Sequence, residues 1–237
     1  MVHAFSASGA VLALFAVVAI FDHRWTDALL WLFAALVVDG VDGTLARAAG
    51  TKEQTPRIDG DALDLVIDYL NYVFVPTLFM IEAELLPDAF ALPLAALIQL
   101  TSLYVFARRD MKTEDNYFRG FPALWNVVAL YLYAAQIDAG VAAAIVAALI
   151  VLTFAPIHFV HPLRVRDFGR WLPATAIVWT ISSLALLFDW PGSVRAGLLT
   201  VCGASAAIIV ALGLLRTARG ARKDSNAAVI SPTGSGT

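Results

Sequence analysis

The sequence contains little cysteine and little charge. Cys202 is the only cysteine of the 237 residues, which excludes an internal disulfide framework and a cysteine-based metal centre. Asp, Glu, Lys and Arg together make up 15% of the chain, whereas 60% of its residues are hydrophobic. No Lys or Arg precedes the first apolar run, so we expect no cleaved secretory signal. Soluble domains are rarely so apolar, and the composition therefore predicts a membrane protein.

Apolar runs recur along almost the whole chain. A transmembrane helix needs about 20 apolar residues, and on this criterion we predict an all-α polytopic membrane protein with about eight transmembrane helices. The predicted spans are residues 5–21, 26–48, 60–80, 89–107, 122–137, 140–158, 171–188 and 194–216. Residues 1–216 would then form one transmembrane domain, and the polar residues 217–237 a disordered cytoplasmic tail. We expect no soluble domain and no nucleic-acid partner.

The basic residues are segregated by loop. Fourteen of the 16 Lys and Arg lie in the second, fourth and sixth connections, at their edges, or after the last predicted span. Only Arg24 and Arg195 fall on the opposite side. Because positive charge collects on the cytoplasmic side of a membrane, this distribution predicts that both termini are cytoplasmic.

Four carboxylates interrupt two of the apolar segments at helical spacing. Asp39 and Asp42 lie three residues apart near the end of the second span, and Asp64 and Asp68 lie four apart in the third. Residues at these spacings share a helix face. Each Asp at mid-membrane costs about 2.5–3.5 kcal/mol, so the set costs on the order of 10 kcal/mol unless cations offset it. Arg47 is the only cation in the motif, so we predict a divalent metal, and all-oxygen ligands suit Mg²⁺ or Mn²⁺.

Other interpretations account for parts of this motif. Close helix packing explains the small residues Gly40, Gly43 and Gly60 but not the acids. A calcium-binding loop requires ligands at alternate positions and a Glu at the twelfth, which this segment lacks. Ion-coupled transporters also carry intramembrane acids. The acids here gather near one membrane face, and no broken helix pair recurs in two halves, yet the transporter stays an alternative.

The motif resembles the signature of the CDP-alcohol phosphatidyltransferases. It runs Asp39-x2-Asp42-Gly43-x2-Ala46-Arg47, and continues as Gly60-x3-Asp64-x3-Asp68. The interval from Arg47 to Gly60 holds twelve residues, more than the family commonly has. This longer interval resembles the bacterial branch that transfers to choline and yields phosphatidylcholine. Residues 112–126 and 161–165 are also similar to that branch.

The resemblance implies a metal-dependent enzyme of phospholipid synthesis in the bacterial inner membrane, with a cytoplasmic active site. It implies that Asp39, Asp42, Asp64 and Asp68 hold two ions, Mg²⁺ or Mn²⁺, and that Asp68 is also the general base. CDP-diacylglycerol and choline would be the substrates, surrounded by membrane lipids, and a homodimer is a further expectation. The residues implied to contact the nucleotide are Asp39, Gly43, Thr44, Ala46, Arg47 and Gly60.

Choline as the acceptor makes a specific demand on the site. A quaternary ammonium is bound by aromatic faces, often with a carboxylate nearby, and Tyr117, Trp125 and Glu114 are our candidates. Tyr and Trp are also enriched at membrane interfaces without any ligand. His158 and His161, at the end of the sixth span, are expected to be structural. Serine, inositol or glycerol phosphate would keep the chemistry with another acceptor, and these alternatives stay open.

Overall fold

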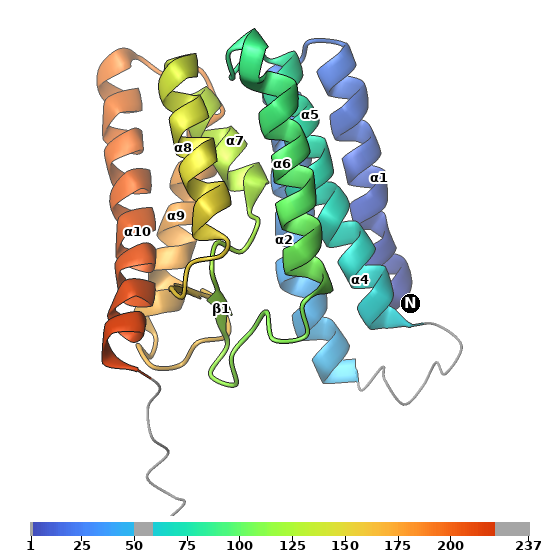
Figure 1. Ribbon diagram of the computed structural model, residues 1–237, viewed down its shortest axis with the longest axis vertical. Coiled ribbons are helices and arrows are strands. Elements are labelled where there is room, and N and C mark those ends of the chain that lie inside the picture. Colours follow the sequence, from blue (N-terminus) through green and yellow to red (C-terminus); the bar gives the residue numbers. More distant parts are fainter. Residues whose placement is uncertain (1, 50–58, 221–237) are drawn as a thin grey trace, which may run out of the picture.

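The helices stand side by side in a bundle, seen from the side in the computed structural model of Figure 1. The structure describes residues 2–49 and 59–220, and the side chains of residues 5–40 and 59–220. In chain order its helices are α1 (Val2–Phe21), α2 (Trp25–Ala49), α4 (Gly60–Tyr69), α5 (Val75–Glu82), α6 (Asp88–Ala107), α7 (Trp125–Ala134), α8 (Ala139–Leu152), α9 (Trp171–Leu186) and α10 (Gly192–Arg219). A π-helical turn, η1 (Leu70–Phe74), joins α4 to α5, and two short strands, β1 (Tyr117–Arg119) and β2 (His158–Val160), complete the set.

The described part of the chain confirms the all-α membrane architecture. Because α4, η1 and α5 follow one another without interruption, these residues form eight continuous helical segments, one for each predicted span. Three of the segments, residues 60–82, 88–107 and 192–219, are long and apolar enough to cross a bilayer. Shorter apolar helices are Phe5–Phe21, Trp125–Ala134, Ala139–Leu152 and Trp171–Leu186.

The sixth span was predicted too long. The helix was expected to reach residue 158, but α8 ends at Leu152, and His158–Val160 form β2 instead. Pro156 explains the early end, because proline cannot donate a backbone hydrogen bond and disfavours helical geometry in the residue before it. β2 pairs antiparallel with β1, and Phe118 lies opposite Phe159. Thirty-eight residues, including α7 and α8, separate the two strands in the sequence.

The approach to α7 explains why the fifth span is also shorter than expected. Residues 122–137 were predicted to be helical, whereas α7 covers only Trp125–Ala134. Gly120 has a positive φ of 78°, and a Cβ atom added there would lie 2.1 Å from the carbonyl oxygen of Thr153. This close approach requires glycine. At Gly120 the chain before α7 packs directly against the backbone at the end of α8.

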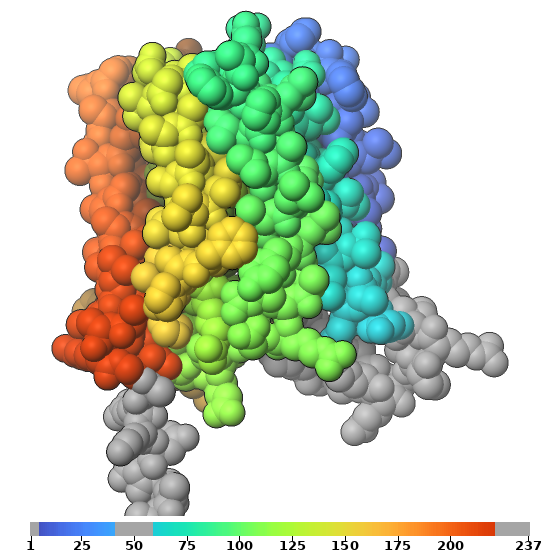
Figure 2. Space-filling model, in the orientation of Figure 1, coloured from blue at the N-terminus to red at the C-terminus, as the bar shows by residue number. Residues whose placement is uncertain are grey.

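One large hydrophobic core joins α1 to α8, and smaller clusters hold the C-terminal helices. The main core contains buried residues of α1, α2, η1, α5, α6, α7 and α8. A separate cluster packs Tyr117 and Val160 of the sheet against Leu172 of α9, with Leu212 of α10 at its edge. Side chains fill the space between the ribbons of α6 and α8, as Figure 2 shows.

The last helix extends past its predicted end. α10 continues to Arg219, three residues beyond the expected boundary at 216. Residues 221–237, which make up most of the predicted tail, lie outside the described residues. Gly213 allows α10 to pass directly over β2, because a Cβ there would lie 2.2 Å from the carbonyl oxygen of His158.

Candidate active site

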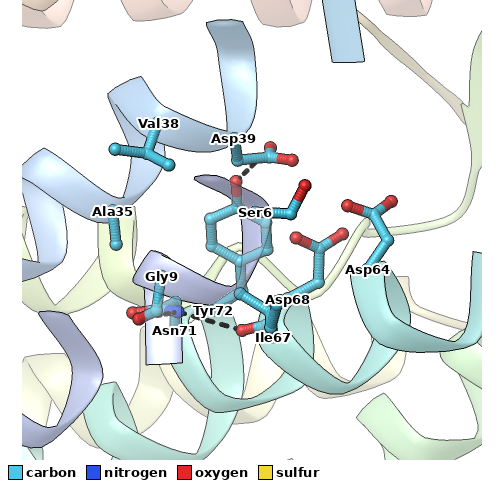
Figure 3. Close-up of a pocket in the computed structure, with 10 residues that line it drawn as sticks. All are labelled: Ser6, Gly9, Ala35, Val38, Asp39, Asp64, Ile67, Asp68, Asn71 and Tyr72. Carbon is cyan, nitrogen blue, oxygen red and sulfur yellow. Dashed lines mark hydrogen bonds between the residues drawn. The ribbon is translucent and has the colours of Figure 1, made fainter. Parts of the chain in front are cut away.

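Three of the four predicted carboxylates converge at one end of the bundle. Asp39 projects from α2, and Asp64 and Asp68 project from α4. One carboxylate oxygen from each lies within 4.8 Å of the others, and Figure 3 shows the three acids among the residues that line a small pocket. The fourth, Asp42, belongs to helix α2, but its side chain lies outside the described residues.

The start of α4 fixes where two of these acids point. Asp59 is the N-cap, and its side chain accepts hydrogen bonds from the backbone amides of Asp61 and Ala62, both at 3.1 Å. Asp59 therefore caps the helix that carries Asp64 and Asp68. Because the helix begins here, Asp64 and Asp68 lie one turn apart on one face.

A π-helical turn extends this polar face by one more residue. η1 contains Tyr72, whose hydroxyl donates a hydrogen bond to Oδ2 of Asp39 across the pocket (Figure 3). The amide of Val75 bonds to the carbonyl of Leu70, five residues back, which widens the turn. Pro76 follows at once and has no amide hydrogen to continue a regular ladder. The phenol of Tyr72 therefore joins η1, which continues α4, to α2.

The N-terminal helix closes the back of the pocket. Ser6 and Gly9 of α1 line it together with the acids and Tyr72. The Asn71 side-chain amide donates to the carbonyl of Gly9 at 3.1 Å and to that of Ile67 at 3.0 Å. A Cβ on Gly9 would lie 2.6 Å from Cγ2 of Ile67. The absence of a side chain at Gly9 therefore lets α1 and α4 pack closely beside the acids.

Lys112, in the loop between α6 and β1, lies within the field of the same acids. Removal from water and the nearby charge of Arg164 lower the pKa of Lys112, while the charges of Asp68, Asp64 and Asp39 oppose that lowering. The turn after β2 reaches α2 directly, because Leu163 lies 3.6 Å from where a Cβ on Gly40 would be. Sequence reasoning did not predict the hydrogen bond from Tyr72 to Asp39, nor a role for Arg164. The spacing 64, 68, 72 was the available signal for the tyrosine.

The predicted nucleotide contacts are described only in part. Gly60 is the first residue of α4, one turn before Asp64. The other members of the set belong to the last turns of α2, and their side chains lie outside the described residues: Gly43, Thr44, Ala46 and Arg47. Their role stays a prediction.

The aromatic candidates for choline have other contacts. Tyr117 is fully buried, and its hydroxyl donates to Oδ2 of Asp167 at 2.9 Å. Trp125 is also fully buried, and its indole nitrogen donates to Oγ of Ser102 at 2.9 Å. Contrary to what an acceptor cage requires, neither ring offers a free face to a ligand in this structure, because each packs inside a hydrophobic cluster. Glu114 is exposed in the loop before β1.

The two histidines lie in or after β2 rather than in a helix. The backbone amide of His158 donates to Oγ1 of Thr217 at 2.8 Å, which ties the strand to α10. Burial and the charge of Arg216 lower the pKa of His158. The His161 ring stacks on Phe118, with centroids 5.6 Å apart and an interplanar angle of 12°.

The donor set at the acids fits a hard divalent cation. It consists of carboxylate oxygens from Asp39, Asp64 and Asp68, which come close enough to share an ion. Mg²⁺ and Mn²⁺ prefer such ligands. Three like charges gathered at one point also explain why this pocket is a functional site rather than packing, because nothing structural requires acids to converge in an apolar bundle.

Similarity to known proteins bears on the same residues. The model of the CDP-alcohol phosphatidyltransferase family matches residues 3–155, which include all the acids of the pocket. Phosphatidylcholine synthase of Pseudomonas aeruginosa is 46% identical over 218 residues, covering 92% of this chain and 91% of the relative. Phosphatidylcholine synthase of Bradyrhizobium diazoefficiens is 41% identical over 220 residues, covering 92% and 82%. That of Legionella pneumophila is 37% identical over 198 residues, covering 80% and 77%.

The family match therefore agrees with the arrangement of the acids and with the helical membrane architecture. It makes this protein an enzyme of phospholipid synthesis that acts by phosphatidyl transfer. The chain belongs to the CDP-alcohol phosphatidyltransferase family.

Proposed function

We propose that this protein transfers the phosphatidyl group of CDP-diacylglycerol to choline, giving phosphatidylcholine and CMP, with Mg²⁺ or Mn²⁺ as cofactor. The observation that carries the proposal is the convergence of Asp39, Asp64 and Asp68 from two helices. The choice of choline is supported by relatives of 46% and 41% identity that are phosphatidylcholine synthases and match nearly the whole chain.

The acids have a defined task in this reaction. Asp39, Asp64 and Asp68, together with Asp42, would hold two ions. Bound there, the ions supply charge neutralisation for the diphosphate and for the departing CMP. Tyr72 holds the Asp39 carboxylate in place through its hydrogen bond. Gly43, Thr44, Ala46, Arg47 and Gly60 would contact the nucleotide, with Arg47 as a charge partner for phosphate.

Asp68 serves as the general base. Its carboxylate accepts the proton of the choline hydroxyl, and the alcohol oxygen attacks the phosphorus that bears diacylglycerol. The bond from that phosphorus to the CMP oxygen breaks, and CMP leaves with the electron pair. No covalent enzyme intermediate is required. Asp68 is half-buried on α4, where the helix holds it at the mouth of the pocket.

The proposed orientation places this chemistry at the cytoplasmic face of the bacterial inner membrane. The ends of α2 and α10, the start of α4 and the sheet all lie at one end of the bundle (Figure 1). These connections carry most of the basic residues, so this end would be cytoplasmic, together with both termini. Choline could then enter from water, and the diacylglycerol would stay in the lipid. Two such chains would associate as a homodimer.

A phosphorylated acceptor such as glycerol phosphate is the alternative that a specific observation favours. Lys112 lies in the field of the acids, and the charge of Arg164 acts on Lys112; cations at an acceptor site suit a phosphate. Purified protein with CDP-diacylglycerol is therefore incubated with choline, serine, inositol and glycerol phosphate, with and without a chelator. We expect lipid product and CMP with choline alone, and no product with chelator until Mg²⁺ or Mn²⁺ is added. Product from another alcohol, and none from choline, would reject the proposed acceptor.

A further inference from the structure

A stack of three side chains stands beside the acids. The Lys112 ammonium lies 5.1 Å from the centroid of the Phe118 ring. The Phe118 ring also stacks on the ring of His161, with centroids 5.6 Å apart and planes 12° from parallel. A cation at this distance over an aromatic face is attracted by the negative charge of the ring face. Phe118 therefore already holds a cation in this structure.

The backbone around Phe118 is rigidly held. Lys112 and Phe118 form an antiparallel bridge, and the amide of Arg119 donates to the carbonyl of Met111 at 3.0 Å. On the other side Phe118 pairs with Phe159 of β2. The ring thus stands on a fixed frame of three adjacent chain segments, whereas the ammonium is at the end of a long, flexible side chain. The cation can leave the ring without any change in the backbone.

Two observations place this stack next to the carboxylate pocket. The charges of Asp68, Asp64 and Asp39 all act on the Lys112 ammonium, with Asp68 the strongest of the three. The turn that follows His161 also packs on α2, where Leu163 contacts Gly40, the neighbour of Asp39. A cation over Phe118 is therefore within the electrostatic reach of the proposed general base.

We propose that the Phe118 face now beneath the Lys112 ammonium is the subsite for the quaternary ammonium of choline, and that Lys112 occupies this subsite until choline displaces it. The inference rests on the proposed function. It names Phe118 as the specificity-determining residue and Lys112 as a tethered competitor. A quaternary ammonium cannot donate a hydrogen bond, and proteins bind it with aromatic faces in a negative field. The Phe118 ring offers such a face. The charge of Asp68 reaches this position, and Asp68 would act on the hydroxyl end of the same small molecule.

The opposing interpretation makes Lys112, with Arg164, a ligand for the diphosphate of CDP-diacylglycerol. The two interpretations predict that one substitution changes different KM values. If Lys112 competes with choline, Lys112→Met lowers the KM for choline and leaves the KM for CDP-diacylglycerol unchanged. If Lys112 holds the diphosphate, the same substitution raises the KM for CDP-diacylglycerol.

The experiment measures both KM values for the full-length protein and four variants. We expect Phe118→Leu to raise the KM for choline about tenfold, which corresponds to about 1.4 kcal/mol, and Phe118→Tyr to stay within about twofold of the wild type. Lys112→Met should lower the KM for choline about threefold. Phe154→Leu is the matched control, because Phe154 is 58% exposed and its ring contacts that of Tyr104 on α6; it should change neither KM.

Tetramethylammonium provides a probe of the same subsite without chemistry. It carries the cation of choline but no hydroxyl, so it should inhibit the wild type competitively against choline, about tenfold more weakly in Phe118→Leu. A wild-type choline KM in Phe118→Leu, or unchanged inhibition there, overturns the subsite. A raised KM for CDP-diacylglycerol in Lys112→Met overturns the competitor role. A wild-type enzyme that makes no lipid from choline rejects the proposed function itself, and this result is distinct from the others.

Discussion

The carboxylate pocket and the sheet region, which comprises β1, β2, the loop before β1 and the end of α10, lie at the same end of the bundle. Their charged side chains are arranged differently. In the pocket, Asp39, Asp64 and Asp68 bring three negative charges within 4.8 Å. In the sheet region, Asp115 accepts a hydrogen bond from Nε of Arg216 at 2.7 Å, with the Arg216 side chain only 10% exposed. One region concentrates charge of one sign, and the other joins opposite charges across the fold.

The difference separates function from structure. Like charges held together raise the free energy of the folded state, so their convergence indicates a ligand that offsets them. A paired acid and base links distant parts of the chain; the pair Asp115 and Arg216 ties the loop before β1 to the end of α10. The family model matches residues 3–155 and so includes the pocket and Asp115, whereas β2, α9 and α10 lie beyond it. We expect substitutions in the two regions to have opposite effects on activity and stability.

The largest effect should come from Asp64→Asn in the pocket. Removing a residue that only supports a metal ligand lowers metal affinity or activity roughly 10–100-fold. Loss of a ligand itself should therefore lower the rate of CMP release at least about 100-fold. The melting temperature of the metal-free protein should stay the same or rise, because one of three like charges is removed. Asp61→Asn, one turn earlier on α4, is the matched control and should keep its activity. A large fall in the melting temperature of Asp64→Asn would contradict the comparison.

Arg216→Met tests the other side of the comparison. The substitution keeps an apolar stem but removes the cation that lies over the ring of Tyr117 and bonds to Asp115. Exposed ion pairs contribute about 0.2–1 kcal/mol to stability, and breaking a buried ion pair costs about 3–5 kcal/mol. Breaking this partly buried pair should therefore lower the free energy of unfolding by about 2 kcal/mol. Denaturant unfolding in detergent measures the loss, with the exposed Arg219→Met as control. CMP release per folded molecule should stay within about twofold of the wild type; a loss comparable with that of Asp64→Asn would remove the distinction.

The sequence could predict the acids of the pocket better than their surroundings. Spacings of three and four residues place carboxylates on one helix face whatever the tertiary fold, which is why Asp64 and Asp68 were expected to point together. The eight helical segments likewise followed from apolar runs. The strands could not be predicted in this way, since each has three residues and its partner lies beyond two intervening helices. The positions of Lys112 and Arg164 depend on that pairing, and Tyr117 and Trp125 are buried by contacts that no local pattern encodes.

Tyr72→Phe tests whether the Tyr72 hydroxyl belongs to the functional pocket. The substitution keeps the ring, which is 7% exposed, and removes only the hydroxyl that donates to Asp39. Asp39 would then be less firmly oriented, and we expect activity at limiting Mg²⁺ to fall about tenfold. Excess Mg²⁺ should recover most of the loss, since the ligand itself remains. Tyr104→Phe, on the exposed face of α6, is the control. If excess metal does not rescue Tyr72→Phe, the hydroxyl has a role other than orienting Asp39.

The smallest effect concerns the pH dependence of the sheet region. Burial raises the pKa of Asp115, but hydrogen bonds from Arg216 and Thr113 and the charge of Arg216 outweigh it, so the pKa lies below its usual value of 3.8. A lowered pKa in the folded state adds stability that is present above pH 3.8 and is lost as the pH falls through the folded value. Arg216 also lowers the pKa of His158, so the comparison is made in a His158→Gln background. There the difference in unfolding free energy between the chain with Arg216 and the chain with Arg216→Met should be constant from about pH 7 to pH 5 and shrink only below 3.8. In that background, a difference that already shrinks between pH 7 and pH 5 would mean that groups other than Asp115 account for the contribution of Arg216, and the charge pairing assigned to this region would be wrong.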